Sequence, residues 1–138
     1  MFSLPIRIYW EDTDAGGVVY HAQYVAFLER ARSEWMRTQG YAQDRLRTGQ
    51  DLVFAVRAIT VDFLRPARLD DAIAVGVQLH ECRRASLVFR QPIHRDGEPL
   101  LTATVRIAAL DAATFRPRPI PQPLYDQLKA LESPHRPG

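Results

Sequence analysis

The stretch YWEDTDAGGVVYHAQYVAFLERAR, residues 9–32, decides the fold, because its apolar residues change their period part-way through. Its first half contains the acidic, glycine-containing segment DTDAGGVVYH, residues 12–21. From about Ala22, apolar side chains recur at the spacing of one helix face. These residues are Tyr24, Phe27, Leu28, Ala31 and Trp35. The pattern predicts a helix of about 18 residues, roughly 27 Å long, that ends near Gly40.

Strands are predicted on both sides of this helix. Apolar and polar residues alternate over residues 4–11, and the run LVFAVRAITVDFL, residues 52–64, is rich in β-branched and aromatic side chains. A change of apolar parity near Arg57 indicates a β-bulge in that run.

Three further strands follow from alternating apolar residues at 73–79, 87–93 and 101–107. The Asp-Gly pair in RDGEP, residues 95–99, predicts a tight hairpin between the last two. Pro92 favours an edge position or a bulge, because proline has no N–H to donate to a central ladder.

The C-terminal part has a different character. Prolines at 117, 119, 121 and 123 should keep the chain extended. LYDQLKALE, residues 124–132, predicts a short helix, and residues 133–138 are expected to be a disordered tail. With 138 residues, the chain is expected to form a single domain over residues 1–132. One helix covers only one face of a five-stranded sheet, so packing alone predicts a homodimer or a larger assembly.

Composition narrows the function classes. A net charge of +2 does not indicate a nucleic-acid binder, although the pI is near 9.0. No run approaches the roughly 18 apolar residues of a membrane span, and no secretory signal is expected at the N-terminus. Cys82 is the only cysteine, which excludes an intrachain disulfide and fits a reducing compartment. The expectation is a cytoplasmic protein with no membrane span and no nucleic-acid partner.

The segment DTDAGGVVYH does not fit the common metal and nucleophile motifs. As a calcium loop starting at Asp12 it fails, because its fifth position is Gly16 and its twelfth is Gln23. None of the four serines stands in a G-x-S-x-G motif, and Cys82 is expected to be a packing residue. No metal and no cofactor are predicted. An ordinary acidic turn is the simplest alternative, since Asp and Gly favour turns.

Thioester hydrolysis is the chemistry that suits this segment if it is more than a turn. A thioester carbonyl is electrophilic, and its thiol leaves readily because a thiol pKa is only about 8.5. The enzyme needs a carboxylate, as base for water or as nucleophile, and N–H donors for the oxyanion. A carboxylate followed by Gly16, Gly17 and a helix start supplies both kinds of group.

Residues 9–32 resemble the signature of the hotdog-fold acyl-CoA thioesterases, in the branch typified by 4-hydroxybenzoyl-CoA thioesterase. They are most similar to the Tol–Pal-associated (YbgC-type) group, and the resemblance extends through FLRPARLDD, residues 63–71, to about residue 110. It implies an α+β hotdog fold, in which a five-stranded antiparallel sheet wraps around one long helix. It also implies dimers that often pair into homotetramers.

The resemblance implies a role for each residue of the loop. Asp14 would be the catalytic carboxylate, and the backbone N–H of His21 would polarise the carbonyl while its imidazole orients water or substrate. Gly16 and Gly17 would shape the loop. Tyr20 would line the substrate site, or belong to the core as Tyr24 would. Asp12 is expected to hold the loop by hydrogen bonds.

The resemblance also bears on the substrate. The position of His21 is aromatic in the 4-hydroxybenzoyl branch, so a histidine disfavours an aromatic acyl group and favours a short aliphatic one. Arg83 and Arg84 lie at a predicted turn that is basic in the family and would bind the phosphates of coenzyme A, unless the turn is merely solvated. Arg65 and Arg68 are further candidates.

The expected function is hydrolysis of acyl-CoA to free acid and CoA. An acyl-acyl-carrier-protein thioesterase would use the same chemistry with acyl carrier protein as partner. The hotdog fold would equally serve a non-catalytic acyl-CoA-binding protein or a dehydratase. Asp14 argues against a merely binding role.

Overall fold

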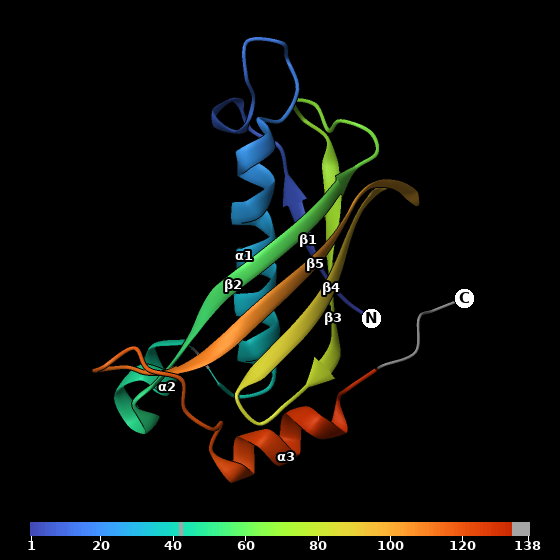
Figure 1. Cartoon of the computed structure of the whole chain (residues 1–138). Coiled ribbons are helices and arrows are strands. Elements are labelled where there is room, and N and C mark those ends of the chain that lie inside the picture. The colour runs from blue at the N-terminus through green and yellow to red at the C-terminus, as the bar shows by residue number, and fades with distance from the viewer. Residues whose placement is uncertain (42, 134–138) are drawn as a thin grey trace.

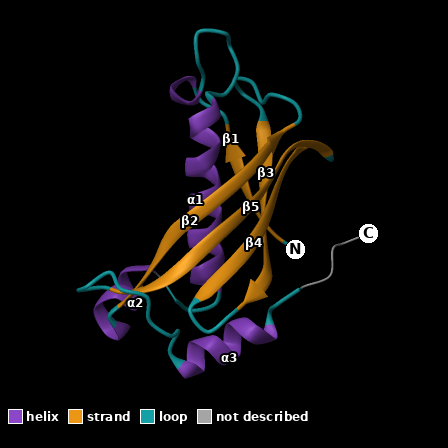
Figure 2. Cartoon of the chain, viewed as in Figure 1, coloured by secondary structure: helices purple, strands orange, loops and turns teal. Residues whose placement is uncertain are grey.

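A five-stranded antiparallel sheet and one long helix dominate the computed structural model, which describes residues 1–41 and 43–133 (Figure 1). The elements in chain order are β1 (Phe2–Arg7), the short 3-10 helix η1 (Trp10–Asp12), α1 (His21–Thr38), α2 (Gln43–Gln50), β2 (Leu52–Phe63), β3 (Ala72–Cys82), β4 (Ser86–Arg95), β5 (Glu98–Asp111) and α3 (Gln122–Ala130). The strand order is β1-β3-β4-β5-β2. The sheet curls around α1 (Figure 2), so the α+β hotdog architecture expected from the sequence is confirmed.

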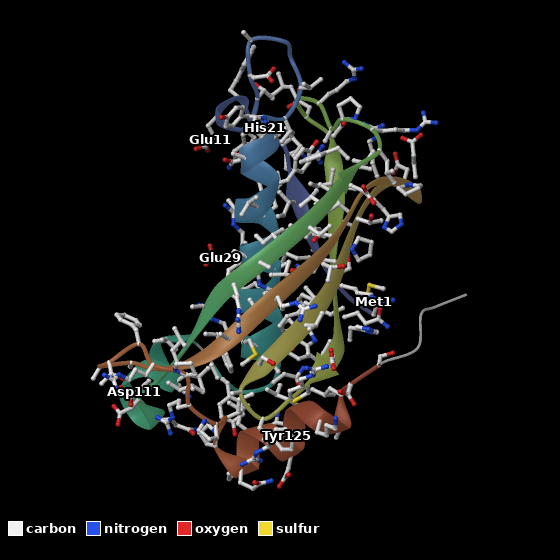
Figure 3. All side chains as sticks on the ribbon, in the orientation of Figure 1. Met1, Glu11, His21, Glu29, Asp111 and Tyr125 are labelled. Atoms are coloured by element: carbon white, nitrogen blue, oxygen red, sulfur yellow. The ribbon has the colours of Figure 1, made fainter. Side chains whose placement is uncertain are left out.

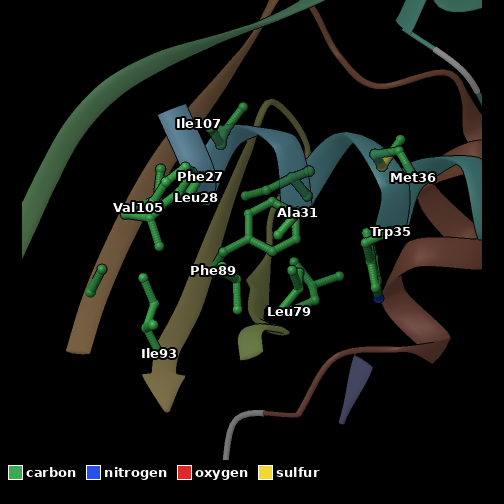
Figure 4. Packing of buried hydrophobic residues seen from close by; sticks show 14 of the residues in the cluster. Phe27, Leu28, Ala31, Trp35, Met36, Leu79, Phe89, Ile93, Val105 and Ile107 are labelled. Atoms are coloured by element: carbon green, nitrogen blue, oxygen red, sulfur yellow. The ribbon is translucent and has the colours of Figure 1, made fainter. Parts of the chain in front are cut away.

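The core lies between α1 and the sheet. All five apolar residues that predicted the helix are buried. They pack against the inward-facing residues of β3, β4 and β5 (Figure 4), and Trp35 meets Phe89 edge-on with ring centroids 5.4 Å apart. Complete burial of a large apolar side chain contributes about 1.5–3 kcal/mol, so this face fixes α1 on the sheet.

Local irregularities of the sheet match two predictions. The register of β2 against β5 shifts between Val56 and Ala58, which places the expected bulge at Arg57. Asp96 and Gly97 have φ angles of 50° and 79°, so the Asp-Gly pair forms the predicted tight hairpin with both central residues left-handed.

Pro92 is not at an edge, because β4 lies between β3 and β5. The ladder is instead irregular around it. Gly76 has no paired residue in β4, and the register against β5 shifts between Ile93 and His94. The buried amide of Gln91 donates to the Gly76 carbonyl at 3.4 Å and to Leu28 O of α1 at 3.0 Å. The Gln91 side chain thus donates to the Gly76 carbonyl, to which Pro92 has no N–H to donate.

The two other α-helices, α2 and α3, lie near the C-terminal end of α1 (Figure 1). α2 was not predicted from the sequence, whereas α3 confirms the expected short helix. After α3, the Ser133 N–H donates to Leu79 O at 2.8 Å, so the chain is fastened to β3 up to that residue. The expectation for residues 134–138 lies outside the described residues. Over residues 1–41 and 43–133, no helix is both long and apolar enough to span a membrane.

Candidate active site

The acidic loop is a small hairpin that closes immediately before α1. Thr13 pairs with Val19 in an isolated antiparallel bridge, and the Asp14 N–H donates to Val18 O at 2.9 Å. Gly17 has a φ of 80° and its N–H donates to Asp14 O at 3.0 Å, which closes the turn. The segment is therefore folded tightly on itself rather than merely solvated.

Gly16 holds the Asp14 carboxylate. Its N–H donates to Asp14 Oδ1 at 2.8 Å, and a Cβ at this position would lie 3.1 Å from the same oxygen. A side chain larger than hydrogen would crowd this approach. The structure records no bond from a described residue to Asp14 Oδ2, and the side chain is exposed. One carboxylate oxygen is thus fixed and the other is available.

Asp12 has the opposite environment. It is only 6% exposed, and its carboxylate accepts from the Tyr9 N–H and from Gln23 Nε2, both at 2.9 Å. Its carbonyl accepts from the Tyr20 N–H at 2.9 Å. Asp12 therefore ties the incoming strand, the hairpin and α1 together, as the sequence suggested, and leaves the exposed carboxylate to Asp14.

The start of α1 presents free N–H groups next to this hairpin. Tyr20 is the N-cap, and its side chain makes no capping bond. The Gln23 N–H bonds back to Tyr20 O at 2.8 Å, whereas the N–H groups of His21 and Ala22 have no acceptor recorded among the described residues. Such groups carry the positive end of the helix dipole and suit a developing oxyanion. The His21 ring is exposed and lies 4.6 Å from the Tyr20 ring.

A second loop fastens this hairpin from outside. Val19 N–H donates to Ala67 O at 2.9 Å, and Val18 bridges to Arg68. The Ala67 N–H donates to the Tyr24 hydroxyl at 3.0 Å. Burial raises the pKa of Tyr24 and outweighs that hydrogen bond, so the hydroxyl stays neutral and structural. Tyr24 is thus a core residue that positions the loop.

A cavity of ≈ 220 Å³ lies beside the helix start. It is lined by Val19, His21, Tyr24, Phe63, Leu64, Arg65 and Pro66. The walls are mostly apolar, with the imidazole and one guanidinium as the flexible polar groups. The exposed Phe63 and Leu64 at its mouth, each more than half exposed, are features that sequence reasoning did not single out.

The chain brings together only part of the predicted site. Asp14, Gly16, Gly17, Tyr20 and His21 share one hairpin and helix start. Arg83 and Arg84 lie at the other end of the molecule. The Arg84 guanidinium sits 4.6 Å from the centre of the Tyr125 ring, and Figure 3 shows Tyr125 at the opposite end from His21. Within one chain, these two arginines do not face the Asp14 loop.

The basic candidates differ in how they are engaged. Arg83 pairs with Glu81 at 2.6 Å and is exposed, whereas Arg84 donates to Gln122 Oε1 at 2.8 Å. Arg65 lines the cavity beside His21 and approaches Glu98 to 3.5 Å. Arg68 is exposed next to the hairpin. Of these four arginines, Arg65 and Arg68 are therefore the ones that lie beside the hairpin and the start of α1 in the single chain.

No group of three or more potential metal ligands among His, Cys, Asp and Glu occurs in the part of the chain that the structure describes. The chemistry available at the loop is that of a carboxylate, an imidazole and backbone amides.

Comparison with known proteins gives a consistent result. The model of the thioesterase-like superfamily matches residues 8–128. The acyl-CoA thioesterase YbgC of Haemophilus influenzae is 42% identical over 121 residues, which cover 88% of this chain and 89% of that protein. The acyl-CoA thioester hydrolase YbgC of Escherichia coli O6:H1 is 42% identical over 130 residues, which cover 94% and 96%.

Among solved structures, a probable thioesterase from Bartonella henselae superposes with a TM-score of 0.83 at 35% identity, and the match covers 87% of this chain and 98% of that one. The family match spans most of the chain and includes both the hairpin and α1. The chain therefore belongs to the thioesterase-like superfamily, and within it to the YbgC-type hotdog thioesterases.

Proposed function

We propose that this protein hydrolyses acyl-CoA thioesters of short aliphatic acids to the free acid and CoA. The observation that carries the proposal is one continuous segment that bears the exposed Asp14 carboxylate and leads into the start of α1. Among the described residues, Asp14 Oδ2 has no partner and the N–H groups of His21 and Ala22 have no acceptor. The names of the curated relatives support CoA thioesters as the substrate class. The small cavity beside His21 supports a short acyl group.

In the proposed reaction, the thioester carbonyl oxygen accepts hydrogen bonds from the N–H groups at the start of α1. Asp14 acts in one of two ways. As a base, it removes a proton from water while the water oxygen adds to the carbonyl carbon. As a nucleophile, the Asp14 carboxylate adds to that carbon directly. The carbon–sulfur bond then breaks, and the departing thiolate takes the proton held by Asp14, or one from water, to give CoA. If Asp14 itself added to the carbonyl carbon, water then hydrolyses the resulting acyl–aspartyl anhydride, which releases the free acid and restores the carboxylate. The amides stabilise the oxyanion of the tetrahedral intermediate, which is where the largest rate gain is expected.

Coenzyme A needs a binding surface for its phosphates, and we assign Arg83 and Arg84 to it in an assembled protein. They are too far along the molecule to serve the Asp14 loop of their own chain (Figure 3). The unpaired edge of β2 offers a place for a second copy, because its 12 residues pair with β5 on one side alone within the described residues. Antiparallel addition of two β2 edges would reverse one copy and bring its arginine turn toward the other copy's hairpin. A homodimer, with a tetramer built from it, is the proposed active form.

The test is release of thiol from purified protein given a panel of acyl-CoAs, from acetyl to palmitoyl and benzoyl, and the same acyl groups on acyl carrier protein. The proposal predicts the highest kcat/KM on short aliphatic CoA thioesters. Faster hydrolysis of the carrier-protein thioesters would contradict it in favour of a protein-borne substrate. Absence of thiol release from every member would leave a binding role.

A further inference from the structure

Arg32 is the charged residue in the buried face of α1. Only 6% of it is exposed, and its neighbours in that face include Leu28, Ala31 and Met36. Burial lowers the pKa of its guanidinium, although the nearby charge of Glu29 raises it again. A cation is costly in such a place unless its donors are used.

Most of the Arg32 donors have no partner among residues 1–41 and 43–133. Nη1 donates to Gln91 Oε1 at 2.9 Å, and no other bond from its five N–H groups is recorded among the described residues. No fully buried side-chain nitrogen in the described ranges lacks a partner. The remaining Arg32 nitrogens therefore still reach open space, although the residue as a whole is buried.

That space is a cavity of ≈ 330 Å³ between α1 and the sheet. Its apolar wall consists of Met36, Phe54, Ala55, Val56, Leu87, Phe89 and Ile107. Its polar lining is Glu29, Arg32 and Ser33, all from α1. An apolar cavity with a guanidinium in its wall suits a short methylene chain that ends in a carboxylate. The apolar wall packs against the methylene groups, and guanidinium and carboxylate pair through two parallel hydrogen bonds.

β2 connects this cavity with the cavity beside His21. Phe54, Ala55 and Val56 in its first half line the Arg32 cavity, and Phe63 at its end lines the His21 cavity. When two β2 edges pair antiparallel about a two-fold axis near their middle, the end of one strand lies beside the start of the other. The Arg32 cavity of one copy would then continue the His21 cavity of the second copy.

We infer that the Arg32 cavity receives the far end of the acyl group and that Arg32 binds a terminal carboxylate there. The preferred substrates are then short acyl-CoA thioesters of dicarboxylic acids. This inference rests on the proposed function and names its substrate class. An acyl group that ends in methyl would leave the Arg32 donors unpaired, which is the kind of mismatch that discriminates strongly between otherwise similar ligands.

Glu29 allows a second test, because its charge is opposite to that of Arg32. It lines the same cavity but is exposed, and no ion pair joins it to Arg32 among the described residues. Its negative charge would oppose a carboxylate bound nearby. Replacing it with the neutral isostere should therefore favour dicarboxylic substrates, whereas loss of Arg32 should disfavour them.

The experiment compares kcat/KM for chain-length-matched pairs, succinyl-CoA against butyryl-CoA and glutaryl-CoA against valeryl-CoA. The wild type should prefer the carboxylate member of at least one pair by about tenfold or more. Arg32→Met should lower kcat/KM for that member by about ten- to a hundredfold and change the methyl member by no more than about threefold. Glu29→Gln should raise the ratio.

Two further variants keep the test interpretable. Arg30→Met removes an exposed arginine from the same helix and should leave the ratio unchanged. Arg32→Lys keeps the charge, so it should retain part of the preference even if Arg32→Met fails to fold. A wild type that prefers the methyl members, or a folded Arg32→Met with an unchanged ratio, would overturn this inference alone. Failure to hydrolyse any member would overturn the proposed function itself.

Discussion

Two aspartates separated by one residue have opposite environments, and this contrast supports the assignment of the catalytic carboxylate. Asp12 is buried and accepts two hydrogen bonds through its side chain, whereas Asp14 is exposed and accepts one from Gly16. The sequence predicted both roles, but only the folded hairpin shows how a difference of two positions moves a carboxylate from the interior to the surface.

Asp12→Ala should destabilise the fold by about 1–3 kcal/mol, because it leaves the Tyr9 N–H and the Gln23 amide without their acceptor. Urea unfolding followed by circular dichroism measures the loss. Asp14→Asn is the matched control and should unfold within about 0.5 kcal/mol of the wild type, as expected of an exposed position. An equal loss in both variants would contradict the division of roles.

Arg83→Ala should raise KM for a CoA thioester more than it lowers kcat, because the phosphates are bound in the ground state as well as in the transition state. The exposed pair with Glu81 contributes little stability, so the fold should persist. Arg37→Ala, which removes another exposed and ion-paired arginine, is the control. If a phosphate-free pantetheine thioester and the CoA thioester are hydrolysed equally well by the wild type, the phosphate site is elsewhere.

At the scale of elements, α1 was the most predictable part. The spacing of its apolar residues predicted which face is buried. The change in that spacing predicted a start within one residue of His21, where the helix begins. α2 escaped prediction because its sequence, QDRLRTGQ, has one large apolar residue and a glycine. The position of Pro92 in a central strand was not predicted either. The Gln91 side chain compensates for the missing N–H, and its placement depends on contact with α1.

The loop between β2 and β3, whose backbone is bonded to the hairpin, is itself held by an acid-sensitive ion pair. Burial alone would raise the pKa of Asp71, but hydrogen bonds from the Arg68 N–H and the Arg95 guanidinium outweigh it and lower the pKa below its ordinary value of 3.8. The same guanidinium also bonds Glu98 at 2.7 Å. Arg95 therefore fastens the loop that carries Ala67 to the end of β4.

A carboxyl with a lowered folded-state pKa contributes stability at pH values above its unfolded pKa and loses it as the pH falls through the folded value. The free energy of unfolding should therefore decrease from pH 7 to about pH 3, and Arg95→Met should be less stable at pH 7 with a shallower decrease. Urea titrations at both pH values, with the exposed Arg106→Met of β5 as control, measure this. Parallel pH profiles for wild type and Arg95→Met would contradict the contact's role.

In the whole molecule, the residues of the proposed site lie at two opposite ends. The hairpin with Asp14 lies at one end of α1, and the Arg83–Arg84 turn lies at the other, beside α3 (Figure 3). The sequence predicted the need for a partner, because one helix cannot cover both faces of a sheet. It could not predict which residues would meet across the proposed interface, since that depends on how two copies align along β2.

Val56→Glu should weaken the proposed dimer, because Val56 is 46% exposed near the middle of β2 and two carboxylates would face one another across the two-fold axis. We expect monomers by sedimentation and an unchanged circular dichroism spectrum. Leu131→Glu, at an exposed apolar residue after α3, should remain dimeric and active. A dimeric, active Val56→Glu would place the interface elsewhere.

Thiol release by the wild type and by Asp14→Asn on the best short-chain acyl-CoA tests the proposed catalytic role of Asp14, provided that both proteins share a melting temperature. The carboxamide keeps the shape of the side chain but can act neither as base nor as nucleophile. Turnover should fall by about a hundredfold or more, in keeping with the usual contribution of a general base. Near-normal turnover by a folded Asp14→Asn would contradict the account and leave the hairpin as a structural turn.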